Sequence, residues 1–211
     1  MKAFLDFMYS TDVNRYFFSD VTWNVFLALI PCCLSFVLYR TLKAKKWNLA
    51  WHEWVPFTLV FLLWIAFLPN TVYLFTMIRH LLDYCRAPTT FRVCPDRAWQ
   101  IMFFFGFALL GVPTFVYSLE RMTRIFRHFF GKLVGFLFPI LIIPVITAGL
   151  LLGLIRRFNS WDLLQYPLFT ANEMLRTLHQ PGIVLNFSVY LVGLYSIYYL
   201  MLWFFSKILK K

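Results

Sequence analysis

Five long stretches of apolar residues follow one another along the chain, separated by polar connections. Each stretch holds about 20 mostly apolar residues, the length that a helix needs to cross the hydrocarbon core of a bilayer. The stretches cover residues 21–42, 54–78, 98–118, 133–155 and 184–206. We therefore expect an all-α protein, a polytopic transmembrane helix bundle of about five spanning helices.

The fourth connection, 156–183, also carries a helical pattern. Its apolar positions recur at helical spacing, at Leu168, at Ala171 or Asn172, at Leu175 and at Leu178. Pro181 and Gly182 follow as a stop signal. This pattern predicts a short amphipathic helix on the outer face of the bundle.

Composition supports a membrane protein of one domain. Of the 211 residues, 61% are hydrophobic and 14% are charged, whereas a soluble domain carries about 25% charged residues. We expect an N-terminal interfacial segment at 1–20, a single transmembrane domain at 21–206 and a basic cytoplasmic tail at 207–211. We expect the first segment not to be a cleavable signal peptide, because Asp6 and Asp12 interrupt it before any long apolar core.

The net charge of +11 reflects lysines and arginines that flank the apolar stretches. Such residues set orientation and contact anionic lipid, so the expected partner is the lipid bilayer and not nucleic acid. Eleven of the 20 basic residues fall on one side of the predicted membrane and nine on the other. The eleven lie in the shorter connections, which places the N-terminus outside and the C-terminus in the cytoplasm.

The second apolar stretch ends in the motif FLPNTVYLFTMIRHL, residues 67–81. At about 100° per residue, one helical face collects Asn70, Tyr73, Met77 and His80. Two interpretations remain open for this face. Asn70 bonds a neighbouring helix or the kink at Pro69 and acts as structural glue, or the face lines a functional pocket.

A second polar motif, RRFNSWDLL at residues 156–164, follows the fourth stretch on the same side. Asn159 and Asp162 are three residues apart, a spacing close to a capping box, and Ser160 is an alternative cap. Asp162 and Arg157 are also in a position to face the first motif across the bundle. The candidate polar pocket comprises Asn70, Tyr73, His80, Arg157, Asn159 and Asp162.

Cofactor and disulfide chemistry leave weaker signals. Metal donors occur at His80, Asp83, Asp162 and Cys85, but their spacing matches no named metal motif, so we predict no metal site and identify no cofactor. Cys85 and Cys94 both lie in the second connection, where an oxidising compartment would let them pair. Their spacing alone does not establish the geometry of a disulfide.

Together, the two motifs resemble those of an uncharacterised family of bacterial multi-span membrane proteins, a domain of unknown function. The family pattern reads LPNAPYxxTDLxHL and then GRxLRWNSWDL, and the resemblance covers residues 23–205. The chain keeps Pro69, Asn70, Tyr73, Thr76, His80, Arg157, Asn159, Ser160, Trp161 and Asp162. Its departures from the pattern include Val72, Met77, Leu154 and Phe158. Met77 replaces an acid and Leu154 an arginine, which suggests an ion pair lost between the second and fourth spans.

Function is less constrained than architecture, and the sequence leaves open whether the protein is an enzyme. The first hypothesis is a binding or assembly component of a membrane complex, with a membrane protein partner or a second copy of the chain. The second is an enzyme for a lipid-linked substrate at the outer leaflet, with His80 as acid or base, Asp162 orienting it and Arg157 holding an anionic head group. A small transporter is the third. The resemblance places each of these in a bacterial inner membrane.

Overall fold

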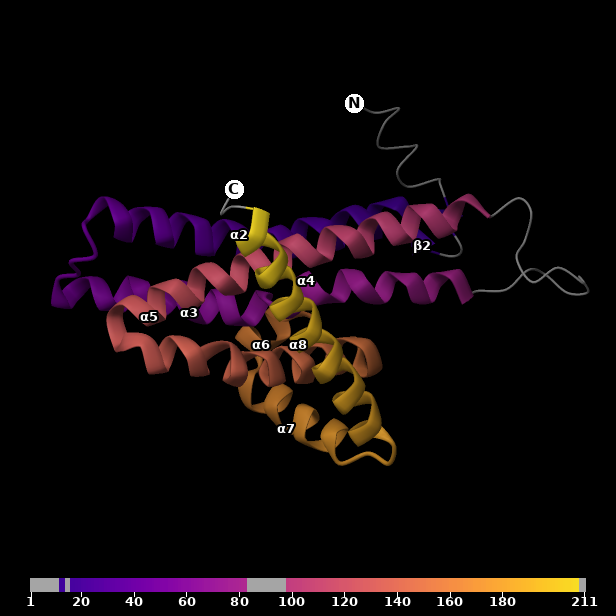
Figure 1. Ribbon diagram of the computed structural model, residues 1–211. Helices are drawn as coiled ribbons and strands as arrows, with labels where there is room; N and C mark the ends of the chain where they lie inside the picture. The colour runs from indigo at the N-terminus through magenta and orange to yellow at the C-terminus, as the bar shows by residue number, and fades with distance from the viewer. Residues whose placement is uncertain (1–11, 14–15, 83–97, 209–211) are drawn as a thin grey trace, which may run out of the picture.

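The computed structural model describes residues 12–13, 16–82 and 98–208, and nearly all of them are helical (Figure 1). In chain order the described elements are β1 (Asp12–Val13), β2 (Tyr16–Phe17), α2 (Phe18–Ala44), η1 (Trp51–Glu53), α3 (Trp54–Phe67), α4 (Pro69–Tyr73), η2 (Leu74–Leu82), α5 (Trp99–Arg156), α6 (Ser160–Gln165), α7 (Pro167–Leu178) and α8 (Ile183–Ile208). β1 and β2 form a two-residue antiparallel pair before α2. The predicted helix bundle is confirmed.

α5 contains two spanning limbs. Its 58 residues are divided at Gly131, where φ of 90° and ψ of 175° favour glycine and the chain folds back on itself (Figure 1). The first limb, 99–130, extends about 48 Å and the second limb, 132–156, about 37 Å, so each exceeds the roughly 30 Å hydrocarbon core. The other segments long and apolar enough to cross a membrane are Asp20–Ala44, Trp51–Ile78 and Ile183–Phe205. Together they account for the five predicted crossings.

The third connection differs from its prediction. The apolar pattern stops at residue 118, but the first limb stays helical for another three turns. Residues 119–130 contain neither glycine nor proline, and Glu120 pairs with Arg124 one turn on, at 2.7 Å. The predicted polar connection at 119–132 is therefore mostly the charged end of a helix.

The core between α3 and the two limbs of α5 is aromatic. Trp64 is fully buried, and its indole N–H donates to the hydroxyl of Ser118 at 2.8 Å. Phe126 and Phe138, one from each limb, stack with 4.2 Å between ring centroids. Burying a polar group without a partner costs about 1–3 kcal/mol, so the Trp64–Ser118 bond lets both side chains lie inside a span.

α8 crosses the bundle obliquely and packs on α5 (Figure 1). Pro144 in the second limb has no N–H, which leaves the carbonyl of Ile140 without its helical donor. The hydroxyl of Tyr195 on α8 donates to that carbonyl at 2.6 Å. Tyr198, one turn later, is buried and donates to Glu120 at 3.0 Å. A proline kink in one helix thus provides an attachment point for another.

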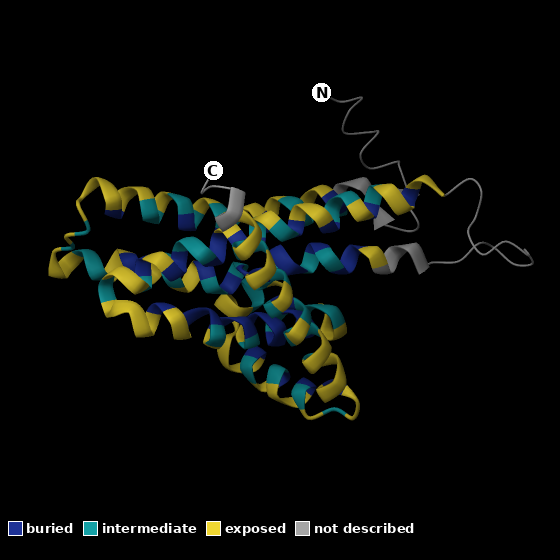
Figure 2. Ribbon diagram, viewed as in Figure 1, coloured by how far each residue is buried: buried dark blue, intermediate teal, exposed yellow. Residues whose placement is uncertain are grey.

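α7 is the predicted amphipathic helix, and it packs its polar side inward. Thr170, Glu173 and Thr177 are buried, whereas Leu168 is 81% exposed. Glu173 forms an ion pair with Arg156 at the end of α5, at 3.8 Å. The leucines therefore lie on the outer side, where Figure 2 shows α7 and α8 largely exposed.

Candidate functional site

The first polar motif forms a break between α3 and α4. α3 ends at Phe67, and α4 begins at Pro69, which has no N–H and suits the first turn of a helix. The side-chain amide of Asn70 donates to the carbonyl of Phe67 at 3.0 Å. This bond satisfies a backbone acceptor at the break, as a kink inside a membrane requires.

Asn70 also joins the two polar motifs. Its amide nitrogen donates a second hydrogen bond to the hydroxyl of Ser160, at 2.7 Å. The two residues are 90 positions apart in sequence, so this is a tertiary contact between α4 and α6. Both structural partners predicted for Asn70, the kink and a neighbouring helix, are present.

Two glycines allow α4 to lie between the limbs of α5. A Cβ atom on Gly111 would lie 2.6 Å from Cε1 of Phe75 and 2.9 Å from the carbonyl oxygen of Thr71. A Cβ atom on Gly149, in the other limb, would lie 2.8 Å from Cγ of Pro69. These separations are shorter than carbon and oxygen atoms tolerate. Both limbs therefore need glycine to approach α4 this closely.

The second motif ends α5 and begins α6. Arg157 lies in the left-handed region, with φ of 58° and ψ of 32°, and so turns the chain out of α5. Asn159 is the N-cap of α6, and its backbone N–H donates to the carboxylate of Asp162 at 2.7 Å. Asn159 and Asp162 thus form the half of the predicted capping box in which the third helical residue bonds the N-cap backbone.

A cavity of about 770 Å³ lies between these motifs. We call it the motif pocket, and its walls come from α2, α3, α4, the second limb of α5, the 157–159 connection, α6 and α7. Four of the six predicted candidates line it, namely Asn70, Tyr73, Arg157 and Asn159. Ser160 lines it as well. The two motifs thus share one site.

The other two candidates are placed differently. Asp162 is not part of the pocket wall, because its carboxylate is taken up by the cap of α6. The side chain of His80 lies outside the described part of the chain, as do Asp83 and the predicted Cys85–Cys94 disulfide. Within the described residues, no three His, Cys, Asp or Glu side chains gather closely enough to hold a metal ion.

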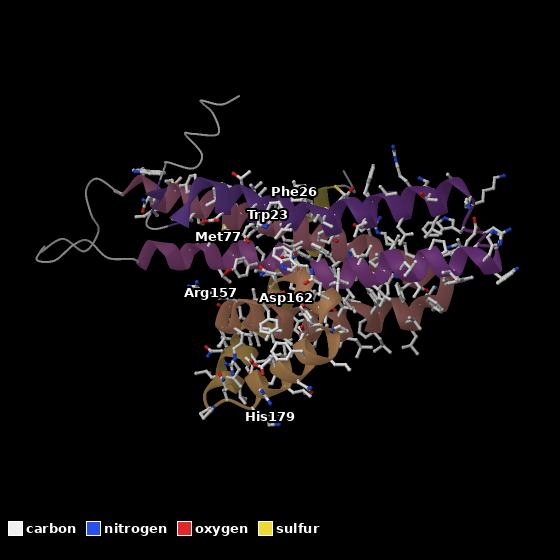
Figure 3. The ribbon with its side chains drawn as sticks, turned by 180° about the vertical axis from the view of Figure 1, so that it is seen from behind. Trp23, Phe26, Met77, Arg157, Asp162 and His179 are labelled. Carbon is white, nitrogen blue, oxygen red and sulfur yellow. The ribbon has the colours of Figure 1, made fainter. Side chains whose placement is uncertain are left out.

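The helical face predicted for the first motif does not continue beyond Tyr73, where α4 ends. Leu74–Leu82 is a 3-10 helix with three residues per turn, so the α-helical spacing used for the prediction does not continue. Met77 is buried in a second cluster with Val21 and Phe104. In Figure 3, Met77 lies on the side where α2 runs, whereas Arg157 lies beside the second limb of α5. Leu154 packs against the main core, so the two positions of the suggested lost ion pair belong to different clusters.

The motif pocket changes character along the bundle axis. Polar lining residues are Asp20, Asn24, Asn70, Arg157 and Asn159. Apolar lining residues further along the same helices are Leu27, Ile65 and Val145. α2 begins, α4 ends and α5 ends at the polar side, and Val145 precedes Arg157 by about 18 Å of helix. The pocket therefore has a polar end and an apolar end.

The contribution of α2 was missing from the prediction. Asp20, Trp23 and Asn24 line the pocket from the first turns of this helix, and Trp23 contacts Trp161 of α6 with 6.4 Å between ring centroids. Their spacing, three and four residues apart, places them on one helical face. That spacing is the sequence signal that could have identified them.

Comparison with known proteins identifies a family and no activity. No curated protein matches the chain, and no solved structure does. The model of a family described as a protein of unknown function (DUF1361) matches residues 23–200. This range includes most of α2, both polar motifs and most of α8. The chain therefore belongs to the DUF1361 family.

Proposed function

We propose that this protein is an integral membrane binding protein whose ligand site is the motif pocket. The observation that carries the proposal is the hydrogen bond from Asn70 to Ser160, which joins both motifs at the wall of one cavity. A volume of about 770 Å³ falls within the roughly 300–1,000 Å³ typical of small-molecule sites. Such sites combine apolar walls with a few polar groups, and this pocket has that composition.

Binding is better supported than catalysis because the polar side chains of the motifs hold the backbone. Asn70 bonds the kink carbonyl, and Asp162 accepts the N–H at the start of α6. The enzyme hypothesis requires Asp162 to orient His80, yet its carboxylate is engaged in the cap and does not line the pocket. The enzyme hypothesis is therefore the weaker of the two.

We propose a bacterial cytoplasmic membrane, with the N-terminus outside and the C-terminus inside. The end of α2 and the end of the first limb lie together, since Trp47 stacks on His128 with 4.4 Å between ring centroids. Basic residues gather at this end of the bundle, at Arg40, Lys43, Lys45, Lys46, Arg124, Arg127 and Lys132. The positive-inside rule assigns such an end to the cytoplasm. The polar end of the motif pocket then lies toward the outside.

As a binding component, the protein would act within a membrane assembly. Its partner would be another membrane protein or a second copy of this chain. Leu185, Val192 and Leu200 are exposed on the outer side of α8, and they supply an apolar surface that suits lipid or such a partner.

Purification in a mild nonionic detergent, followed by native mass spectrometry, tests the proposal. Ala171 lines the pocket from α7, so Ala171→Phe fills part of the cavity, whereas Asn172→Phe adds the same ring at the neighbouring exposed position. We expect a defined small molecule to accompany the wild type and Asn172→Phe, and to fall at least tenfold in Ala171→Phe. Proteins that co-elute in stoichiometric amount would identify the partner.

The proposal fails if no bound molecule depends on the pocket. Equal occupancy in all three proteins, with the folded state verified by size-exclusion chromatography and thermal unfolding, would leave the two motifs with a structural role alone. A molecule lost equally from both phenylalanine variants would indicate disturbance of α7 and not occupation of the cavity.

A further inference from the structure

We propose that the ligand of the motif pocket is an amphiphile, with one anionic head group held by Arg157 and an apolar chain that runs toward Val145. This inference rests on the proposed function, because it names the chemical class bound in the same pocket. Its basis is an uncompensated guanidinium, a left-handed backbone at that residue, and a lining that changes from polar to apolar.

Arg157 brings an uncompensated positive charge to the polar end. Among the described residues, the neighbouring Arg156 pairs with Glu173, whereas the guanidinium of Arg157 forms no hydrogen bond and no ion pair. Asp20 also lines the pocket, on the α2 side, but it already has an interaction partner other than Arg157. A bound anion would supply the counter-charge that the described protein groups do not.

The backbone at Arg157 points to a role for its side chain. Its φ of 58° and ψ of 32° define a helix end where glycine is the favoured residue, because glycine adopts this region without a steric penalty. An arginine at such a position is strained, and strained residues gather at ligand-binding sites. The side chain that glycine would lack is the one that lines the pocket.

The apolar end suits a hydrocarbon chain that enters from the bilayer. Val145 lines the pocket and is 47% exposed, in a limb of α5 that is long enough to cross the membrane. Leu27 and Leu150 form buried parts of the same wall. Removing CH₂ groups from water is favourable, so a chain here adds affinity that a free head group would not have.

A guanidinium pairs through two parallel N–H bonds with either a phosphate or a carboxylate. Asn159 and Ser160, which also line this end, add polar groups for the same head group. A lipid phosphate and a fatty carboxylate share this chemistry, and the following experiment separates them.

The thermal unfolding of the full-length protein in nonionic detergent provides the test, because a ligand of the folded state raises the midpoint with its concentration. The probes are dodecyl phosphate, dodecanoate, dodecanol and inorganic phosphate. Dodecyl phosphate, dodecanoate or both should raise the midpoint at concentrations where dodecanol and inorganic phosphate do not. The stronger of the two anions identifies the head group.

Variants at two adjacent arginines make the test specific. Arg157→Gln should weaken the apparent affinity at least tenfold, whereas Arg156→Gln, with the same change in net charge, should keep it. Arg157→Gly should raise the midpoint without ligand, because it relieves the left-handed strain, and should still lose the response. This gain in stability separates a binding defect from misfolding.

Two results would overturn the inference and leave the proposed function intact. One is an equal response to dodecanol, retained in both Arg157 variants and abolished by Ala171→Phe, which would indicate a neutral ligand. The other is a full response to inorganic phosphate alone, which would show that an apolar chain contributes nothing to binding. If Ala171→Phe alters the response to none of the probes, and no co-purified molecule depends on it, the proposed function fails as well.

Discussion

Asn70 stabilises the site at two points with one amide group. It donates to the backbone at the kink and to a side chain of α6. Hydrogen bonds between membrane helices contribute about 0.6 kcal/mol on average and up to about 1.7 kcal/mol, and an unsatisfied carbonyl adds its own penalty. Loss of this side chain therefore affects both the shape of α4 and the docking of α6.

Asn70→Leu keeps the approximate size of the side chain and removes both donors. We expect it to lower the free energy of unfolding by about 1–3 kcal/mol, and Ser160→Ala by about 1 kcal/mol or less. Because the two residues share a bond, the double variant should differ from the sum by about 0.5 kcal/mol or more. Unfolding by sodium dodecyl sulfate in mixed micelles measures all three.

Asn186→Leu is a matched control for that cycle. Asn186 is exposed on α8 and donates to the carbonyl of Gly182 at 3.3 Å, within its own chain segment. Its replacement should change the free energy of unfolding by less than about 0.5 kcal/mol. Strict additivity of Asn70→Leu and Ser160→Ala would contradict the direct contact between the motifs.

At the residue scale, the sequence predicted correctly that the two motifs meet. It did not predict which of their side chains are in contact. Both motifs were expected on the same side of the bundle, with Asp162 and Arg157 opposite Asn70. The structure instead pairs Asn70 with Ser160. The choice between neighbours on a short helix depends on its rotation, which the left-handed turn at Arg157 sets, and no sequence pattern announces such a turn at an arginine.

At the scale of elements, the position of α4 depends on the absence of two side chains. α4 has only five residues and lies against both limbs of α5. Gly111 faces it from one limb and Gly149 from the other. Small residues of this kind let membrane helices approach closely, where van der Waals packing is the main attraction.

Gly149→Ala and Gly111→Ala should each lower the free energy of unfolding by about 1–3 kcal/mol, the typical effect of overpacking a filled interior. Gly106→Ala and Gly193→Ala are the controls, because nothing lies within 4 Å of a Cβ atom at either position. They should be neutral or stabilising by about 0.5–1 kcal/mol, since alanine is the better helix former. The same unfolding assay in mixed micelles compares all four.

Equal effects at all four glycines would mean that helix propensity, and not the approach of α4, explains the loss. A second measurement, ligand occupancy, distinguishes Gly149 from the control glycines. If α4 shifts, the ligand that accompanies the wild-type protein should be depleted in Gly149→Ala, because Pro69 and Gly149 both line the motif pocket.

The sequence predicted the elements well where length and hydropathy determine them. The five crossings follow from the bilayer thickness, which demands about 20 apolar residues whatever the packing. The 3-10 helix from Leu74 was not predicted, and its change of period moved Met77 from the expected face into the core. Whether the end of a span is an α-helix or a 3-10 helix depends on tertiary packing, which a count of apolar periodicity does not include.

At the scale of the whole molecule, the two ends of the bundle carry different chemistry. One end combines lysines and arginines with aromatic rings, including Trp47 and Trp54, which suits a membrane surface. The turn after α5 and the short helices α6 and α7 lie away from that end, below the middle of the bundle in Figure 1. They line the polar part of the motif pocket, so a ligand bound there would lie away from the basic surface.

Reporter fusions in bacterial cells test this orientation. Green fluorescent protein at the C-terminus should fluoresce, because it matures in the cytoplasm, and alkaline phosphatase at the C-terminus should be inactive. Alkaline phosphatase fused after Gln180, in the connection between α7 and α8, should be active, whereas a fusion after Asn48, between α2 and α3, should not. By the positive-inside rule, we expect the basic residues beside Asn48 to retain that connection in the cytoplasm. An active alkaline phosphatase fusion after Asn48, with an inactive one after Gln180, would indicate the opposite orientation. The polar end of the motif pocket would then lie on the cytoplasmic side, and its ligand would come from the inner leaflet.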